Sequence, residues 1–209
     1  VFCRNDWSVW SFPAVEDDCL PEISPAVEPA LLARINAGEW LLCAGQGLPL
    51  IETQFQISCA GRMEGNLATV VNSHPMLGDF PHEGFCDWQF HQLFNQATTV
   101  NLTSFPEQLF APVLEVASSY KRPLRQGSLF EWALGAGRLL VCSLNLTAND
   151  PAARYLRYQL GQYLQTAGKG KCLPCPRLVS ADLLALNTGG ITLFENTDAG
   201  FDARAQLRK

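Results

Sequence analysis

The chain has 209 residues, of which 47% are hydrophobic and 17% charged, and its net charge is -5. This composition indicates a globular domain with a buried core rather than a disordered chain. No run of Lys and Arg interleaves with aromatic residues, which argues against a nucleic-acid surface. The apolar runs are far shorter than the roughly 20 residues that span a bilayer.

The first residues, VFCRNDWSVW, lack the basic start and long apolar centre of a signal peptide, and no initiator Met is present. We therefore expect a processed protein or a segment of a longer one. Residues 1–28 are rich in Pro, Trp and acids, which predicts an irregular lead-in with one short strand at most.

Helix and strand patterns alternate from Pro29 onward. The run PALLARIN at 29–36 has helical spacing with Pro in its first turn, and Gly38 follows as a stop. Residues 85–96 predict an amphipathic helix that Asp87 caps. Strands are predicted at residues 40–44, 67–72 (buried), 98–102 and 111–117.

The clearest local signal is SLFEWALGAGRLLVCSLNL, in which two apolar runs flank Gly135-Ala136-Gly137. This pattern predicts a β-hairpin, with Glu131 facing the opposite side from Phe130 and Trp132. A strong helix follows over 151–165, capped by Asp150, and a short helix near 180–186 lies in a tail marked by Gly and Pro.

This order of elements favours an α/β fold with a mainly parallel sheet, helices on both faces and an antiparallel hairpin at one edge. We expect a lead-in segment at 1–28, an α/β domain at 29–166 and a C-terminal extension at 167–209.

All three histidines, His74, His82 and His91, fall within a short stretch that also contains Glu83 and Asp87. A metal site is disfavoured, because no pair has the i, i+4 spacing of a helical metal motif and His82 adjoins Glu83. We expect turn or structural roles here, with ligand binding as the alternative. We predict no metal and no cofactor.

Of the eight cysteines, Cys43 and Cys142 lie inside apolar runs and are predicted core residues. Cys172 and Cys175 form a CxxC pair without the strand–helix context of a redox motif. A local disulfide or two free thiols is the preferred interpretation.

The best match to a nucleophile elbow surrounds Cys59, and the next surrounds Cys43. Neither has the leading Gly, and no His follows His91, so cysteine catalysis is disfavoured. Paired carboxylates for glycoside cleavage would have to involve Glu115 and Glu131, a weak signal in a chain of this length.

The aromatic residues from Phe85 to Phe94 could form a face that stacks on sugars. A core role on the predicted helix is the more common one for such residues.

Several ordered motifs carry a family resemblance: His74-Pro75, Phe80-Pro81, Asp87-Trp88-Gln89-Phe90, Leu129-Phe130-Glu131, Gly135-Ala136-Gly137 and Pro151 to Arg154. Over residues 30–166 the chain resembles an accessory domain of family two glycoside hydrolases of the β-galactosidase type. That domain is similar to the class I glutamine-amidotransferase fold and to the trimerisation domain of other β-galactosidases.

The resemblance implies a flavodoxin-like, glutamine-amidotransferase-like three-layer sandwich that has lost its nucleophile and histidine. Residues 48–66 are short for that fold. The family's catalytic carboxylates lie on a separate barrel, so no catalytic residue carries over. A bacterial source and a periplasmic or extracellular location would fit this resemblance.

The leading hypothesis is a non-catalytic accessory domain of a carbohydrate-active enzyme, serving domain packing, oligomerisation or glycan contact. The alternatives are a stand-alone hydrolase or amidase with a Cys nucleophile and a carbohydrate-binding module. Expected partners are other domains of a glycoside hydrolase, a second copy or a carbohydrate. The candidate ligand or interface residues are His74, His82, Glu83, Asp87, Trp88, Gln89 and Glu131.

Overall fold

The computed structural model describes residues 3, 5–6, 8–53, 68–103, 105, 109–117, 124–167, 173–181 and 183. Their elements are, in chain order, η1 (Asp17–Cys19), β1 (Ser24–Ala26), α1 (Pro29–Asn36), β2 (Trp40–Gln46), β3 (Leu50–Glu52), β4 (Ala68–Val71), η2 (Pro75–Leu77), η3 (Trp88–Phe90), β5 (Thr98–Asn101), β6 (Leu114–Ala117), β7 (Gln126–Leu134), β8 (Gly137–Cys142) and α2 (Pro151–Leu164). The elements labelled η are short 3₁₀ helices.

The lead-in becomes part of the fold through a strand–helix–strand unit. β1 pairs in parallel with β2, and α1 connects them. Pro29 opens α1, where the missing N–H costs no helical hydrogen bond, and Leu31, Leu32 and Ile35 form its buried face. Gly38, with a φ of 117°, lets the chain turn directly into β2.

The predicted hairpin is present, but its expected place at one edge of the sheet is wrong, because β7 and β8 lie at the centre of the strand order. β7 and β8 pair antiparallel from Leu129–Cys142 to Leu134–Gly137, and Gly135 and Ala136 form the turn. Gly135 has a φ of 54°, and a Cβ on it would lie 2.7 Å from the Cα of Asn36 at the end of α1. Glycine is therefore required where the hairpin tip meets this helix.

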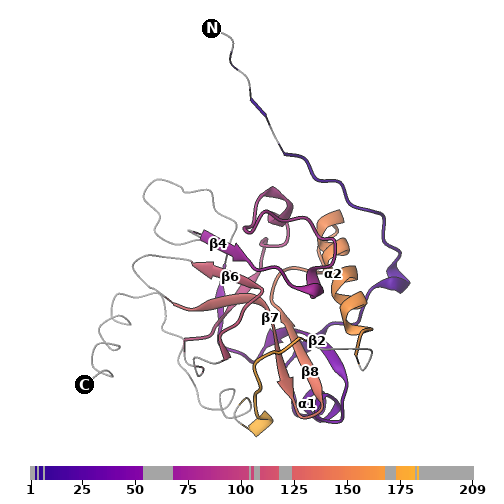
Figure 1. Ribbon diagram of the computed structural model, residues 1–209, viewed down its shortest axis with the longest axis vertical. Helices are drawn as coiled ribbons and strands as arrows, with labels where there is room; N and C mark the ends of the chain where they lie inside the picture. The colour runs from indigo at the N-terminus through magenta and orange to yellow at the C-terminus, as the bar shows by residue number, and fades with distance from the viewer. Residues whose placement is uncertain are drawn as a thin grey trace, which may run out of the picture.

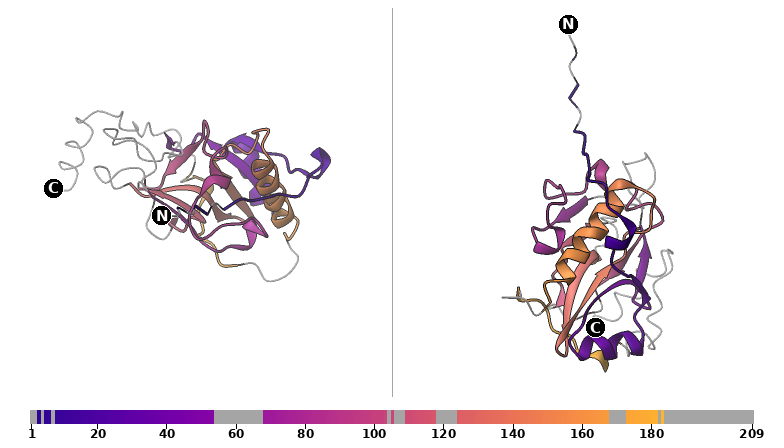
Figure 2. Two further views of the ribbon diagram at one scale, coloured as in Figure 1. Left: turned by 90° about the horizontal axis from the view of Figure 1, so that it is seen from above. Right: turned by 90° about the vertical axis from the view of Figure 1, so that its right-hand side faces the viewer.

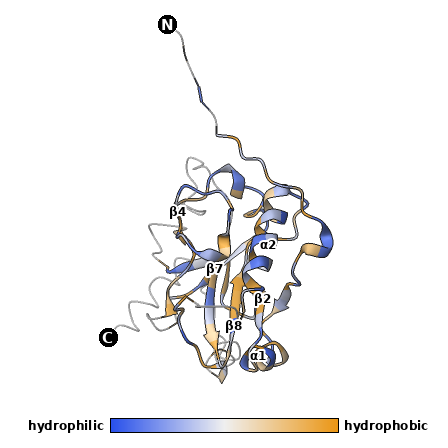
Figure 3. Ribbon diagram, turned by 45° about the vertical axis from the view of Figure 1, so that its right-hand side comes forward, coloured by the Kyte–Doolittle hydropathy of each residue, from blue (hydrophilic) through white to orange (hydrophobic). Residues whose placement is uncertain are grey.

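Side chains of the hairpin alternate between two separate cores, as the period of a strand requires. Leu129, Leu140 and Cys142 enter the core under α2 and the 3₁₀ helices η2 and η3. Phe130, Trp132 and their neighbours on β8 enter the core on the α1 side. In Figure 3, β8 is coloured as hydrophobic, whereas α1 and α2 carry hydrophilic positions as well.

The eight strands form one curled mixed sheet in the order β1-β2-β8-β7-β5-β3. β6 also pairs with β7, and β4 pairs with β6 to extend the sheet (Figure 1). The lead-in crosses α2 on its way to β1, as the right-hand view of Figure 2 shows. Arg154 and Arg157 of α2 hold it there by donating hydrogen bonds to the carbonyl oxygens of Val15 and Pro21.

The predicted mainly parallel, flavodoxin-like sandwich is wrong. Among the described strands, five pairings are antiparallel and two are parallel. Two α-helices, α1 and α2, lie wholly within the described residues, and a parallel connection needs a crossover of a dozen or more residues. Among the described strands, β3 to β8 pair with one another only in the antiparallel sense, and β8 also pairs in parallel with β2.

The predicted helix over residues 85–96 is also wrong. Only Trp88–Phe90 forms a 3₁₀ helix, and turns continue to Gln96, whose φ is 56°. Phe90, Leu93 and Phe94 are nevertheless fully buried, so the helical spacing of apolar residues reports their burial but not a regular helix.

Strand β4 corresponds to the buried strand predicted at 67–72, but it lies at the margin of the sheet. Val71 is buried, whereas Val70 is 44% exposed, so the expected burial is wrong for most of the strand. Residue 67 lies outside the described residues. In the predicted helix at 180–186, Ser180, Ala181 and Leu183 are helical, and the other positions also lie outside them.

Candidate functional site

A cleft of about 460 Å³ opens between the lead-in, the turns around η3 and the start of α2. Its walls consist of Ser8, Val9, Trp10, Ser11, Phe12, Trp88, Gln89, Gln92, Asp150, Pro151 and Ala152. Its size is within the usual range for small-molecule sites. The cleft therefore brings together two of the predicted residues, Trp88 and Gln89, with lead-in residues that the sequence did not indicate.

The lead-in provides the aromatic wall of the cleft. Phe12 anchors this segment, because its ring stacks on Phe80 at 5.6 Å and contacts Tyr155 at 5.8 Å. Trp10 is partly exposed beside it, and Val9 is 88% exposed. Within the described part of the chain, residues 8–11 make no hydrogen bond to the rest of the fold, so side-chain packing alone places this wall.

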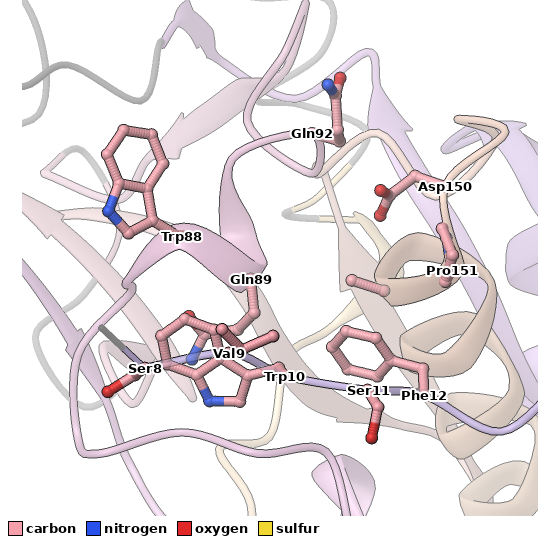
Figure 4. A pocket seen from close by; sticks show the side chains of 11 residues that line it. Ser8, Val9, Trp10, Ser11, Phe12, Trp88, Gln89, Gln92, Asp150 and Pro151 are labelled. Carbon is pink, nitrogen blue, oxygen red and sulfur yellow. The ribbon is translucent and has the colours of Figure 1, made fainter. Parts of the chain in front are cut away.

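Polar groups line the opposite side. Asp150 caps α2 by accepting a hydrogen bond from the Ala153 amide at 3.1 Å through Oδ2. Figure 4 shows its carboxylate directed into the space between α2 and the η3 turn; Gln92 also lines the cleft, but its carboxamide end points away from Asp150 in this view. One helix cap thus also presents a carboxylate to the cleft.

Gln89 extends from η3 beneath this space. Its Nε2 donates a hydrogen bond to the Pro81 carbonyl at 3.1 Å, whereas its Oε1 is buried and accepts none. A buried acceptor without a donor costs about 1–3 kcal/mol. In Figure 4 the amide end of Gln89 points toward Ser8 and Trp10.

Trp88 stands at the rim of the cleft. Its side chain is 49% exposed and its ring lies 5.8 Å from that of His91. In Figure 4 the indole points away from Trp10. The expected core role of this aromatic group therefore holds for Phe90 and Phe94 but not for Trp88.

A second group of polar side chains lies where β7 and β8 meet α2 and the start of η2. We call it the Glu131 cluster, and it consists of Glu131, Arg138, Tyr163 and His74. Arg138 forms an ion pair with Glu131, and the Tyr163 hydroxyl lies 3.0 Å from Glu131 Oε2. His74 Nε2 lies 3.6 Å from Glu131 Oε1. The guanidinium of Arg138 also packs 4.6 Å above the Trp40 ring.

Burial dominates the electrostatics of the Glu131 cluster. It raises the pKa of Glu131, although Arg138 and the Tyr163 hydroxyl oppose this effect. Burial and the charge of Arg138 lower the pKa of His74, which favours the neutral imidazole. That form suits its other contact, since His74 Nδ1 accepts a hydrogen bond from the Met76 amide at 3.2 Å.

The remaining predicted residues have local structural roles. Asp87 accepts a hydrogen bond from the Trp88 amide and caps η3 as expected. His82 Nδ1 accepts one from the Gly84 amide within a turn, next to the exposed Glu83. The histidines do not converge, and the described residues hold no cluster of three or more potential metal-binding His, Cys, Asp or Glu side chains.

The described core cysteines are unsuited to nucleophilic catalysis. Burial raises the pKa of Cys43 to about 11 and that of Cys142 to about 12, so both thiols stay protonated at neutral pH. Cys59 lies outside the described residues, as does Cys172. The interpretation of the CxxC pair therefore remains a prediction.

A family model covers residues 55–170, more than half of the chain. The chain belongs to the family described as a domain of unknown function, DUF8487. The DUF8487 match includes Gln89, Asp150 and the whole Glu131 cluster, whereas Trp10 and Phe12 precede it. No curated protein matches the chain. No helix among the described residues is long and apolar enough to cross a membrane.

Proposed function

We propose that this domain is a non-catalytic carbohydrate-binding module that serves as an accessory part of a carbohydrate-active enzyme. The observation that carries the proposal is the cleft, whose walls combine the aromatic side chains of Trp10 and Phe12 with the polar side chains of Gln92 and Asp150. Our assignment of the carbohydrate class rests on this chemistry, and the link to a carbohydrate-active enzyme rests on the sequence motifs alone, because the fold that the family resemblance implies is not the one observed.

A sugar ring has apolar C–H faces and an edge of hydroxyl groups. The indole of Trp10 can pack against the apolar face, as aromatic rings do in most ligand sites. The Asp150 carboxylate and the Gln92 carboxamide can accept hydrogen bonds from the hydroxyl edge. A longer oligosaccharide would reach Trp88 at the rim.

The Glu131 cluster supports a binding role over a catalytic one. It contains a carboxylate and a histidine, but Glu131 is 4% exposed and already paired with Arg138 and Tyr163. No residue of this cluster lines the cleft. Among the described residues, a ligand in the cleft would therefore contact only one acidic side chain, that of Asp150. Glycoside cleavage uses two carboxyl groups.

The proposal is tested by titrating the domain with soluble cello-, xylo-, galacto- and manno-oligosaccharides. Binding is measured by calorimetry and by the indole N–H signals in ¹H–¹⁵N NMR spectra. We expect one series to bind and to shift the Trp10 signal. Trp10→Ala should weaken binding about 10-fold or more, because truncating an aromatic anchor typically costs over 1 kcal/mol.

Phe85→Ala is the matched control, because Phe85 is 44% exposed and does not line the cleft. Its affinity for the oligosaccharide should equal that of the unsubstituted domain. Absence of binding across all four series, or equal losses in the two variants, would refute a sugar site in this cleft.

A further inference from the structure

The Oε1 atom of Gln89 is the one buried side-chain oxygen or nitrogen of the described residues that has no hydrogen-bond partner. Its side chain is fixed from the other end, because Nε2 donates to the Pro81 carbonyl. Exchanging the two amide atoms would place Oε1 against that carbonyl oxygen, so the present orientation is the favourable one. The acceptor is therefore held in place without a donor.

The position of this acceptor connects it to a ligand. Gln89 lines the cleft and is 6% exposed. The wall above it is the lead-in at residues 8–11, which no hydrogen bond ties to the described fold. A small shift of this wall would open Oε1 to the cleft without breaking any backbone hydrogen bond.

We infer that Gln89 determines the specificity of the cleft, because its ligand must donate a hydrogen bond, from a hydroxyl group, to Gln89 Oε1. This inference rests on the proposed function for the identity of that ligand as a sugar. It adds a requirement that general stacking on Trp10 does not impose. A ligand that carries only acceptors at this point leaves Oε1 unpaired and binds more weakly.

The first test uses two small probes, glycerol and its trimethyl ether, which has similar oxygens but no O–H donor. The readout is the shift of the Gln89 side-chain amide signals and of the Trp10 indole signal in NMR titrations. We expect glycerol to shift both and the ether to shift neither. Gln89→Met keeps the side-chain length and should abolish the Trp10 response to glycerol.

Gln159→Met is the matched control, because Gln159 is similarly buried on α2 but does not line the cleft. It should respond to glycerol as the unsubstituted domain does. Equal shifts with the ether, an unchanged response in Gln89→Met, or no response to either probe would overturn the inference.

The second test uses the best-binding sugar of the oligosaccharide panel as its methyl glycoside, with its monodeoxy analogues. One monodeoxy analogue should bind the unsubstituted domain about 10-fold or more weakly than the parent methyl glycoside does. The same analogue should have equal affinities for the unsubstituted domain and for Gln89→Met. Unchanged sugar affinity in Gln89→Met would overturn the inference and leave the sugar site standing. Glycerol binding that depends on Gln89, without any oligosaccharide binding, would overturn only the proposed function.

Discussion

The cleft and the Glu131 cluster both place polar side chains in the interior, but they differ in how these groups are paired. In the Glu131 cluster, the carboxylate has partners from β8 and α2, and Trp40 covers the guanidinium. In the cleft, the buried Gln89 is satisfied at its nitrogen and unsatisfied at its oxygen.

This difference separates a group that stabilises the fold from one that can recognise a ligand. A paired buried charge resists change, because removing either partner leaves the other uncompensated. An unpaired acceptor beside an open cleft can gain stability from a ligand that carries a donor. Substitutions in the two regions should therefore act on different properties, stability for Glu131 and binding for Gln89.

The largest effect is expected from Glu131→Gln. It removes the negative charge that compensates the buried guanidinium of Arg138, which should lower the free energy of unfolding by about 3–5 kcal/mol. Urea denaturation at pH 7 measures this change. Glu83→Gln alters an exposed carboxylate and should stay within about 0.5 kcal/mol of the unsubstituted domain.

The double variant Glu131→Leu with Arg138→Met tests the cause of that loss. Replacing both charges with apolar groups should recover most of the stability, because no buried charge remains. A double variant as unstable as Glu131→Gln would show that packing, and not the uncompensated charge of Arg138, is responsible.

A smaller loss is expected from Tyr163→Phe, which removes only the hydroxyl that bonds to Glu131. A hydrogen bond to a charged group contributes about 1.5–3 kcal/mol, and the denaturation midpoint should fall accordingly. Tyr158→Phe on the same helix is the control, since no hydrogen bond of the Tyr158 hydroxyl is present in the described structure. Equal losses in both variants would contradict the role assigned to Tyr163.

His74 gives the cluster a pH dependence of defined sign. Because its pKa is lowered in the folded state, its contribution to stability is present above its ordinary pKa near 6.5 and is lost as the pH falls through the lower folded value. The groups facing it are Glu131, Arg138 and Tyr163. Glu131 acts with the opposite sign, since its pKa is raised.

The free energy of unfolding should therefore fall more steeply below pH 6.5 in the unsubstituted domain than in His74→Asn. Asparagine retains an acceptor that can cap η2 but does not titrate. His91→Asn, the same substitution at an exposed histidine, is the control variant. Parallel profiles for the unsubstituted domain and His74→Asn would rule out this contribution.

The sequence predicted the local elements of the fold better than their arrangement. Pro29, Asp150 and the Gly135-Ala136 turn mark a helix start, a helix cap and a hairpin, because each imposes its geometry on a few neighbouring residues. Strand pairing depends on contacts between distant segments, and an apolar run looks alike in a parallel and an antiparallel sheet. The parallel sheet was therefore a wrong inference from correctly placed strands.

The cleft and the Glu131 cluster also differ in how far the sequence could predict them. The hairpin register places Glu131 opposite Leu140, two residues from Arg138 on the same face, so this pair could have been found from the sequence. The cleft could not have been found from the sequence, because Trp10 lies far from Gln89 in the chain. The two residues come together only when the lead-in packs along α2. Trp88 and Gln89 were indicated through motif resemblance, without their geometry.

The smallest effect on stability is expected from Gln89→Met. This substitution removes the hydrogen bond to Pro81, a loss of about 1 kcal/mol, and also removes the unpaired acceptor, a gain of about 1–3 kcal/mol. The two terms oppose each other, so the free energy of unfolding should change by no more than about 2 kcal/mol, in the stabilising direction if it changes at all. A loss of 3 kcal/mol or more by urea denaturation would mean that Oε1 is paired in solution, and the contrast between the two regions would disappear.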